Sequence, residues 1–433
     1  MNKTTGIFSA ISRLKTKGFF QIFSATIINS MISFVYGIFI VRLLTKSEYG
    51  LFSYTQSISN FGLLFCSLGL NLGILQYCTE NRKLEQKYSL SKFAFLGGLL
   101  TSVITCIILL GYSGIDGSNL EGVVGGIIAF SFLPIAYWLK DWIISNLRWQ
   151  LKNREYAIVM NVHSILNAVL VVLGAYLNGI YAAILGIYLA YLISIIVGLY
   201  YLREDGKKII HASRVEKEIV PDFVKYSVTM CIVNAMISVL FTIDTFVIGN
   251  VLQNAEEIAS YRTASVIPFA LNMIPNAVMT FMYPYISRNK HDKEWLKREL
   301  KKVYIANGVL NIGIGICLLI IAEPLIRILF GSSYEGTVQI FRLLTISYMV
   351  SASLRTPSAN ILGMLKMTKS AFVVSTATVL LSAFLSYNLV KAYGITGAAY
   401  GSCITFTVVG IGSFIIIIKY LYKKQLKKPE AEV

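Results

Sequence analysis

TIINSMISFVYGIFIVRLLTKSEYGLFSY, residues 26–54, decides the fold because a degraded copy of it returns about two hundred residues later. INSMIS at 28–33 matches VNAMIS at 233–238, an offset of 205 residues. Ser53-Tyr54 recurs as Ser260-Tyr261 at an offset of 207. A second pair of landmarks closes each half, GIYAA at 179–183 and GITGAA at 394–399. The pattern predicts one module that is used twice.

The composition is that of a membrane protein. Hydrophobic residues make up 55% of the 433 residues and charged residues only 14%, with a mean hydropathy of +0.65. A soluble domain needs a polar surface that this composition does not supply. The six cysteines show no CxxC spacing and no Cys/His cluster, so we expect neither disulfides nor a metal site.

Apolar segments of about 20 residues, the length that spans a bilayer as a helix, recur twelve times. The predicted transmembrane helices are Phe19–Val41, Leu51–Tyr77, Phe93–Tyr112, Gly122–Ser145, Tyr156–Leu177, Tyr181–Tyr201, Phe223–Gly249, Tyr261–Ile286, Val303–Ala322, Val338–Leu362, Ala371–Val390 and Thr396–Ile418.

The placement of the basic residues predicts the orientation. If the N-terminus is cytoplasmic, 30 of the 39 Lys and Arg residues fall in inner segments and four in outer segments. Such a bias is the positive-inside signal, so both termini are expected in the cytoplasm. The net charge of +17 is then mostly a signal for topology. No basic motif with interleaved aromatic residues indicates a nucleic-acid partner.

Six predicted helices precede the basic stretch at 203–222 and six follow it. An even number of helices in each repeat leaves both copies in the same orientation. We therefore predict an all-α polytopic membrane protein, with twelve transmembrane helices in two six-helix bundles related by a pseudo-twofold axis along the membrane normal. The expected domains are a bundle at 1–201, a cytoplasmic linker at 202–220, and a bundle with a basic tail at 221–433.

Four loose motifs carry a family resemblance by their order. They are RLLTKSEYGLFSY (42–54), IDTFVIGNVL (243–252) with the proline-rich helix after it, PLIRILFGSSYEG (324–336) and GITGAAYG (394–401). With them the chain resembles the Wzx-type polysaccharide flippases of the multidrug/oligosaccharidyl-lipid/polysaccharide exporter superfamily. The resemblance implies a MATE-like fold and the movement of undecaprenyl-pyrophosphate-linked sugar repeats to the outer leaflet by alternating access. Drug-exporting relatives often use an acidic residue in helix one, which this chain lacks.

Three arginines are the candidates for binding a pyrophosphate, because the planar guanidinium can bind two phosphate oxygens at once. Arg262 and Arg342 begin helices eight and ten, whereas Arg355 lies about 20 Å further along helix ten. Ionisable groups at membrane depth are expensive and often functional. Arg262 and Arg342 are near enough to helix ends to reach the interface instead.

Helix eight is the most irregular predicted helix. Pro268, Asn272, Pro275 and Asn276 share one face. Each proline removes an N–H and frees a carbonyl, which membrane proteins tolerate where protein or a water-filled cavity satisfies it. We expect a bent helix whose Asn272 and Asn276 bind substrate, or a kink that is packed against its neighbours.

Two further residues are candidates for ion coupling. His163 in helix five is either a hydrogen-bonded interior residue or part of a proton relay. Asp244 in helix seven is expected to pair with Arg262, either as a structural ion pair or as a switch that a proton or sodium ion releases. Lys140 and Lys225 are expected to anchor their helices at the cytoplasmic interface.

The sequence favours a lipid-linked oligosaccharide flippase of a bacterial inner membrane that is not an enzyme and has no catalytic residues. No nucleotide-binding or nucleophile motif is present, so we expect no cofactor, with transport driven by a proton or sodium gradient. The expected partners are the bilayer, the lipid-linked substrate, and a polysaccharide polymerase with its chain-length machinery. A cation-coupled small-molecule or multidrug antiporter is the alternative, and a membrane-embedded polymerase or ligase is a third reading.

Overall fold

The computed structural model describes residues 19–115, 120–240, 242–289, 292–365 and 367–422, and all regular structure in these residues is helical. The chain forms two compact units. The first contains the described residues up to Val266 together with Leu329–Tyr334, and the second contains Ile267–Ile328 and the described residues from Glu335 onward. The domain boundaries expected at residues 201 and 221 stay a prediction.

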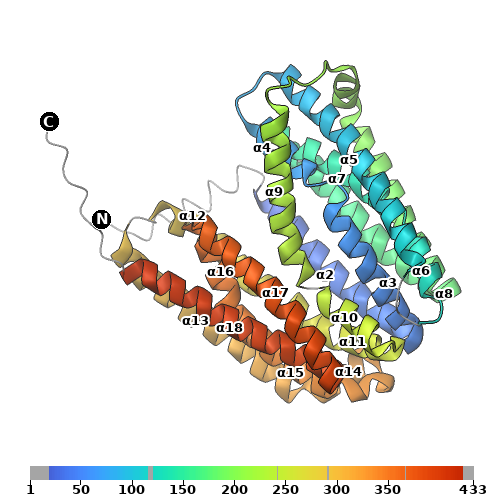
Figure 1. The fold of residues 1–433 in the computed structure, drawn as a ribbon, viewed down its shortest axis with the longest axis vertical. Coiled ribbons are helices and arrows are strands. Elements are labelled where there is room, and N and C mark those ends of the chain that lie inside the picture. The colour runs from blue at the N-terminus through green and yellow to red at the C-terminus, as the bar shows by residue number, and fades with distance from the viewer. Residues whose placement is uncertain (1–18, 116–119, 241, 290–291, 366, 423–433) are drawn as a thin grey trace. The chain divides into compact units, whose positions relative to one another are not determined.

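The helices follow one another with short connections (Figure 1). Those that begin in the first unit are α2 (Phe19–Leu43), α3 (Lys46–Phe65), α4 (Leu70–Thr79), α5 (Leu84–Ser113), α6 (Val123–Phe130), α7 (Leu133–Trp149), α8 (Asn153–His211), α9 (Val220–Val239), α10 (Ile243–Leu252) and α11 (Ala255–Ala270). The later helices are α12 (Met273–Arg288), α13 (Lys293–Ile320), α14 (Ala322–Phe330), η1 (Ser332–Thr337), α15 (Val338–Val350), η2 (Ser351–Arg355), α16 (Thr356–Met364), α17 (Thr368–Tyr393) and α18 (Ile395–Tyr422).

The all-α membrane fold predicted from the sequence is confirmed. In the described residues, nine helical stretches are long and apolar enough to cross a membrane. One of them, the 59-residue α8, contains two of the predicted segments. Two further predicted segments correspond to α2, with its apolar part at Met31–Leu43, and to α9 with α10.

Two glycines make the tight turns that close the repeated halves. Gly179 interrupts α8 with φ 66° and ψ −146°, and Gly394 separates α17 from α18 with φ 61° and ψ −146°. Residues with a β-carbon avoid this backbone region, so only glycine suits the turn. The two glycines are the landmarks of the predicted repeat, and their shared conformation supports it. Figure 1 shows α17 and α18 packed side by side, joined by the second turn.

Several of the predicted transmembrane helices are broken near their middle. Helix two consists of α3 and α4, with a turn at residues 66–69 between them. Helix seven is divided into α9 and α10, and helix eight into α11 and α12. An offset of 207 carries the first break, at 66–69, to residues 273–276, which begin two residues after the start of the observed break at Leu271–Asn272. Both halves of the repeat therefore interrupt their second helix at nearly the same place.

Tryptophans hold the core of the first unit together. Trp138 and Trp142 of α7 are buried and donate hydrogen bonds to the carbonyls of Phe95 (3.3 Å) and Ser91 (3.1 Å) on α5. A β-carbon at Gly98 would lie 2.2 Å from the Trp138 ring, so glycine allows α5 and α7 to approach closely. This packing fixes the rotation of α7, which carries the charged residues described below.

Candidate functional site

A cavity of about 530 Å³ lies within the first unit at the breaks of helices two and seven. It is lined by α3, α4, α7 and α9 and by the turns that join α3 to α4 and α9 to α10. The polar residues that line it are Asn60, Ser67, Asn71, Tyr137, Asp141, Asn234, Ser238 and Thr242. Among the lining residues that the structure describes there is no arginine or lysine.

The break in helix two is built into the fold. Leu68 and Gly69 have φ angles of 46° and 73°, and a β-carbon on Gly69 would lie 2.2 Å from the Ser227 carbonyl oxygen. The carbonyl of Cys66, which the break frees, accepts hydrogen bonds from the hydroxyls of Thr101 (2.7 Å) and Ser102 (3.0 Å). Irregular backbone at membrane depth persists where protein satisfies it or where it lines a cavity, and this turn does both.

Asp141 is the only carboxylate among the described residues that line this cavity. Its Oδ2 accepts a hydrogen bond of 2.5 Å from the Asn71 amide, 70 residues away in the chain. Its Oδ1 accepts no hydrogen bond from the residues that the structure describes. Asp141 is not among the candidate residues predicted from the sequence. The sequence feature that could have identified it is the pair of opposite charges Lys140-Asp141 inside the apolar stretch WLKDWII.

Lys140 is buried, and its ammonium lies 4.6 Å from the ring centroid of Tyr191 and 5.9 Å from that of Tyr137. The expectation of an interfacial anchor was therefore wrong, because the packing of α7 turns Lys140 into the unit. His163 lies against the same Tyr191 ring, with centroids 4.4 Å apart, and its Nδ1 is 3.3 Å from the Ser194 hydroxyl. His163 is thus a hydrogen-bonded interior residue, and its role in a proton relay stays a prediction.

Asp244 is buried at the beginning of α10 and accepts a 2.5 Å hydrogen bond from the hydroxyl of Tyr261. The expected ion pair with Arg262 is not among the ion pairs of the described residues. The reason is helical geometry, because successive residues point about 100° apart around a helix. Tyr261 and its neighbour Arg262 therefore point in different directions, and Tyr261 is the one that reaches Asp244. A coupling role for Asp244 stays a prediction.

Arg355 belongs to the second unit and lies at the end of the π-helical turn η2. Its Nε donates to the Ser351 hydroxyl at 2.9 Å, and the guanidinium carbon lies 4.6 Å from the centroid of the Phe406 ring. No carboxylate of the described residues forms an ion pair with it. Arg342 is exposed on α15, 13 residues earlier. π-Helical turns are rare in proteins, and those that occur are often found at functional sites.

The break in helix eight follows from its prolines. Pro275 has no N–H for the Leu271 carbonyl, which instead accepts a tighter hydrogen bond of 3.0 Å from the Ile274 N–H. The side-chain amide of Asn272 donates to the Pro268 carbonyl at 3.2 Å, and that of Asn276 donates to the Asn272 carbonyl at 2.9 Å. The predicted irregularity is confirmed, and substrate binding by Asn272 and Asn276 stays a prediction.

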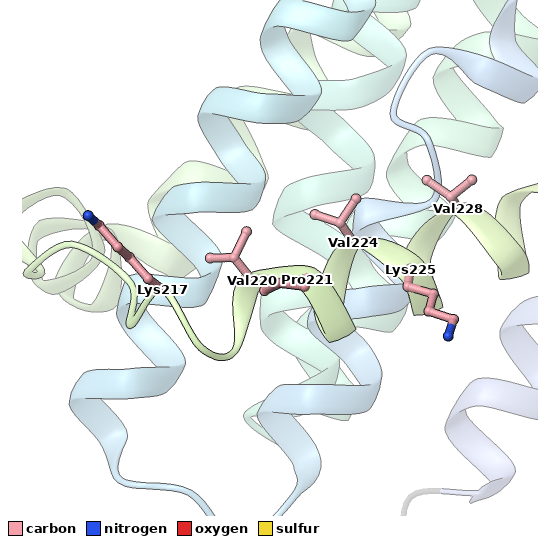
Figure 2. Close-up of a pocket in the computed structure, with 6 residues that line it drawn as sticks. All are labelled: Lys217, Val220, Pro221, Val224, Lys225 and Val228. Atoms are coloured by element: carbon pink, nitrogen blue, oxygen red, sulfur yellow. The ribbon is translucent and has the colours of Figure 1, made fainter.

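An apolar groove of about 660 Å³ lies at the beginning of α9 and is lined by Lys217, Val220, Pro221, Val224, Lys225 and Val228. Figure 2 shows the three valines pointing to one side of the helix and Lys225 to the other. Valines at every fourth position make an apolar stripe that suits lipid chains. The polar cavity beside Asp141 is therefore the better candidate for a polar ligand.

Comparisons with known proteins agree with this architecture. A family model described as polysaccharide biosynthesis protein matches residues 16–290. A putative O-antigen transporter of Shigella flexneri is 24% identical over 377 residues, which are 83% of this chain and 87% of that protein. A membrane protein of Methanocaldococcus jannaschii is 25% identical over 392 residues, 87% of this chain and 91% of that protein.

Two solved structures share the fold. The lipid II flippase MurJ in an inward closed conformation has a TM-score of 0.74 at 15% identity, covering 91% of this chain and 86% of that one. An inward-facing multidrug transporter of the MATE family has a TM-score of 0.71 at 14% identity, covering 95% and 100%. The chain therefore belongs to the polysaccharide biosynthesis protein family and has the fold of the multidrug/oligosaccharidyl-lipid/polysaccharide exporter superfamily.

Proposed function

We propose that this protein is a flippase for undecaprenyl-pyrophosphate-linked oligosaccharide repeats in a bacterial inner membrane. It moves the repeats from the inner to the outer leaflet by alternating access, for the assembly of a surface polysaccharide. A polysaccharide polymerase and its chain-length machinery then take over the cargo. The family and the name of the Shigella flexneri relative support the class of cargo.

The single observation that carries the proposal is the environment of Arg355. A guanidinium inside a membrane-spanning segment is expensive unless an anion or a polar group compensates it. Only Nε of Arg355 donates to a described residue, and no described carboxylate pairs with it. Ser351 and Phe406 hold the guanidinium in place, which leaves its two terminal amino groups for a bidentate anion. A pyrophosphate supplies that anion.

A transport assay in proteoliposomes tests this role. Removing a charge-assisted hydrogen bond costs about 1.5–3 kcal/mol, so Arg355→Ala is expected to reduce flipping roughly 10- to 150-fold. Arg355→Lys is expected to lose nearly as much, because an ammonium does not replace the planar fork. The control is Arg327→Ala, since Arg327 is exposed and pairs with Glu335 on the surface of the second unit. Full transport by Arg355→Ala would remove this residue from the site.

A cation-coupled antiporter is the second candidate, and the buried carboxylate of Asp244 favours it. A buried acid can bind a proton or a sodium ion and so couple transport to a gradient. The two candidates differ in phenotype. Deletion of an antiporter gene raises drug susceptibility, whereas deletion of a flippase gene stops surface glycan export and leaves drug susceptibility unchanged.

A further inference from the structure

We propose that the cavity beside Asp141 is a saccharide subsite that holds a sugar of the glycan. This inference rests on the proposed function and assigns one part of the cargo to one place. A lipid-linked oligosaccharide has three chemically different parts, an apolar chain, a pyrophosphate and a set of sugars. Each part requires a different surface of the protein.

The lining of the cavity suits a sugar better than a phosphate. Of the residues that the structure describes there, three amides, one carboxylate, three hydroxyls and the ring of Tyr137 line the cavity, and none is an arginine or lysine. Amides donate and accept, and a carboxylate accepts strongly, so together they match hydroxyl groups. An aromatic ring adds a flat apolar face. A pyrophosphate would meet the negative charge of Asp141, and no described lining residue is a cation that could bind it directly.

The volume and the rigidity of the cavity also suit a small polar ligand. Pockets for small ligands occupy about 300–1,000 Å³, and this cavity has about 530 Å³. The hydrogen bond from Asn71 fixes the orientation of the Asp141 carboxylate. Its Oδ1, which accepts nothing from the described residues, is left for a hydroxyl donor.

The helix breaks supply the second observation. Binding sites in transporters form where membrane helices are discontinuous. Ser67 and Gly69 of the first break and Thr242 of the second line this cavity. The hydroxyls of Thr101 and Ser102 bind the freed Cys66 carbonyl from α5, so the break is stable without a ligand. The cavity is thus held open by the fold.

The test compares two ligands that differ only in their sugars. One is the lipid-linked glycan extracted from a strain that lacks this gene, and the other is undecaprenyl pyrophosphate. Binding of each to the purified full-length protein is measured by native mass spectrometry. Asp141→Asn is expected to weaken glycolipid binding about 10-fold or more, while binding of undecaprenyl pyrophosphate stays within twofold of the parent.

Asn234→Ala is the second variant, because Asn234 is exposed and makes no hydrogen bond with the described residues, so the fold does not depend on it. It is expected to weaken glycolipid binding about 3- to 10-fold. Asn161→Ala, which removes an amide of the same unit outside the cavity, is the matched control and is expected to bind both ligands like the parent.

Three results would overturn the inference. Glycolipid binding within twofold of the parent in both cavity variants would show that the cavity does not hold the glycan. An equal loss of both ligands would show that the cavity acts on the lipid pyrophosphate instead. A parent protein that binds neither ligand would refute the proposed function, and the subsite with it.

Discussion

Gly394→Ala places a β-carbon in the turn between α17 and α18. Its effect on stability measures backbone strain alone, because the new β-carbon collides with nothing. Gly394 has φ 61° and ψ −146°, a region that is essentially restricted to glycine. A β-carbon built on it meets no heavy atom within 4 Å. The substitution therefore adds no collision, and any loss of stability reports the cost of holding alanine in this backbone conformation.

The expected loss can be estimated from that conformation. A strained backbone residue costs about 1–3 kcal/mol, and alanine recovers about 0.4–1 kcal/mol by restricting the unfolded chain. The net destabilisation is then roughly 1–2 kcal/mol, or about 5- to 30-fold in the unfolding equilibrium. Gly397→Ala is expected to cost more, because its β-carbon would lie 2.0 Å from the Leu389 carbonyl oxygen and the two helices would have to separate.

The assay is reversible unfolding of the purified protein in mixtures of a mild detergent with dodecyl sulfate. Gly412→Ala is the matched control, since Gly412 lies inside α18 and its β-carbon also meets nothing within 4 Å. It is expected to be neutral or slightly stabilising, because alanine favours the helix. The predicted order of stability is Gly412→Ala, then Gly394→Ala, then Gly397→Ala. If Gly394→Ala is as stable as Gly412→Ala, the reasoning about the turn is wrong.

Three further predictions concern orientation, the Lys152–Asp205 ion pair and coupling. Reporter fusions after Asn254 should report outside and those after Gly206 inside, and an inverted pattern at both sites would break the twelve-helix topology. Lys152→Met should destabilise the protein by about 0.5–1 kcal/mol, because the 2.6 Å ion pair with Asp205 is partly exposed; thermal unfolding measures this, and the difference should shrink in high salt. Asp244→Asn in liposomes should lose its response to an imposed proton or sodium gradient if this residue couples transport, and a parent-like response would exclude that role.

The sequence by itself determined the features that the bilayer and the backbone impose. The number of helices follows from apolar segments of membrane-spanning length, which have few alternatives in a lipid environment. The turn glycines at 179 and 394 and the broken helix eight also follow from local chemistry. A glycine-only conformation and a proline without an N–H act within a few residues of the chain.

Only the tertiary structure decided which side chains meet. Asn71 and Asp141 are 70 residues apart, and their contact depends on the rotation of α7, which its tryptophans fix against α5. The same dependence explains why Asp244 binds Tyr261 and not the adjacent Arg262. Adjacent residues of a helix point about 100° apart. A periodic sequence pattern therefore shows which residues share a face of the helix, but not which residues of another helix they contact. Packing between distant helices selects the partner, and this information is not local in the sequence.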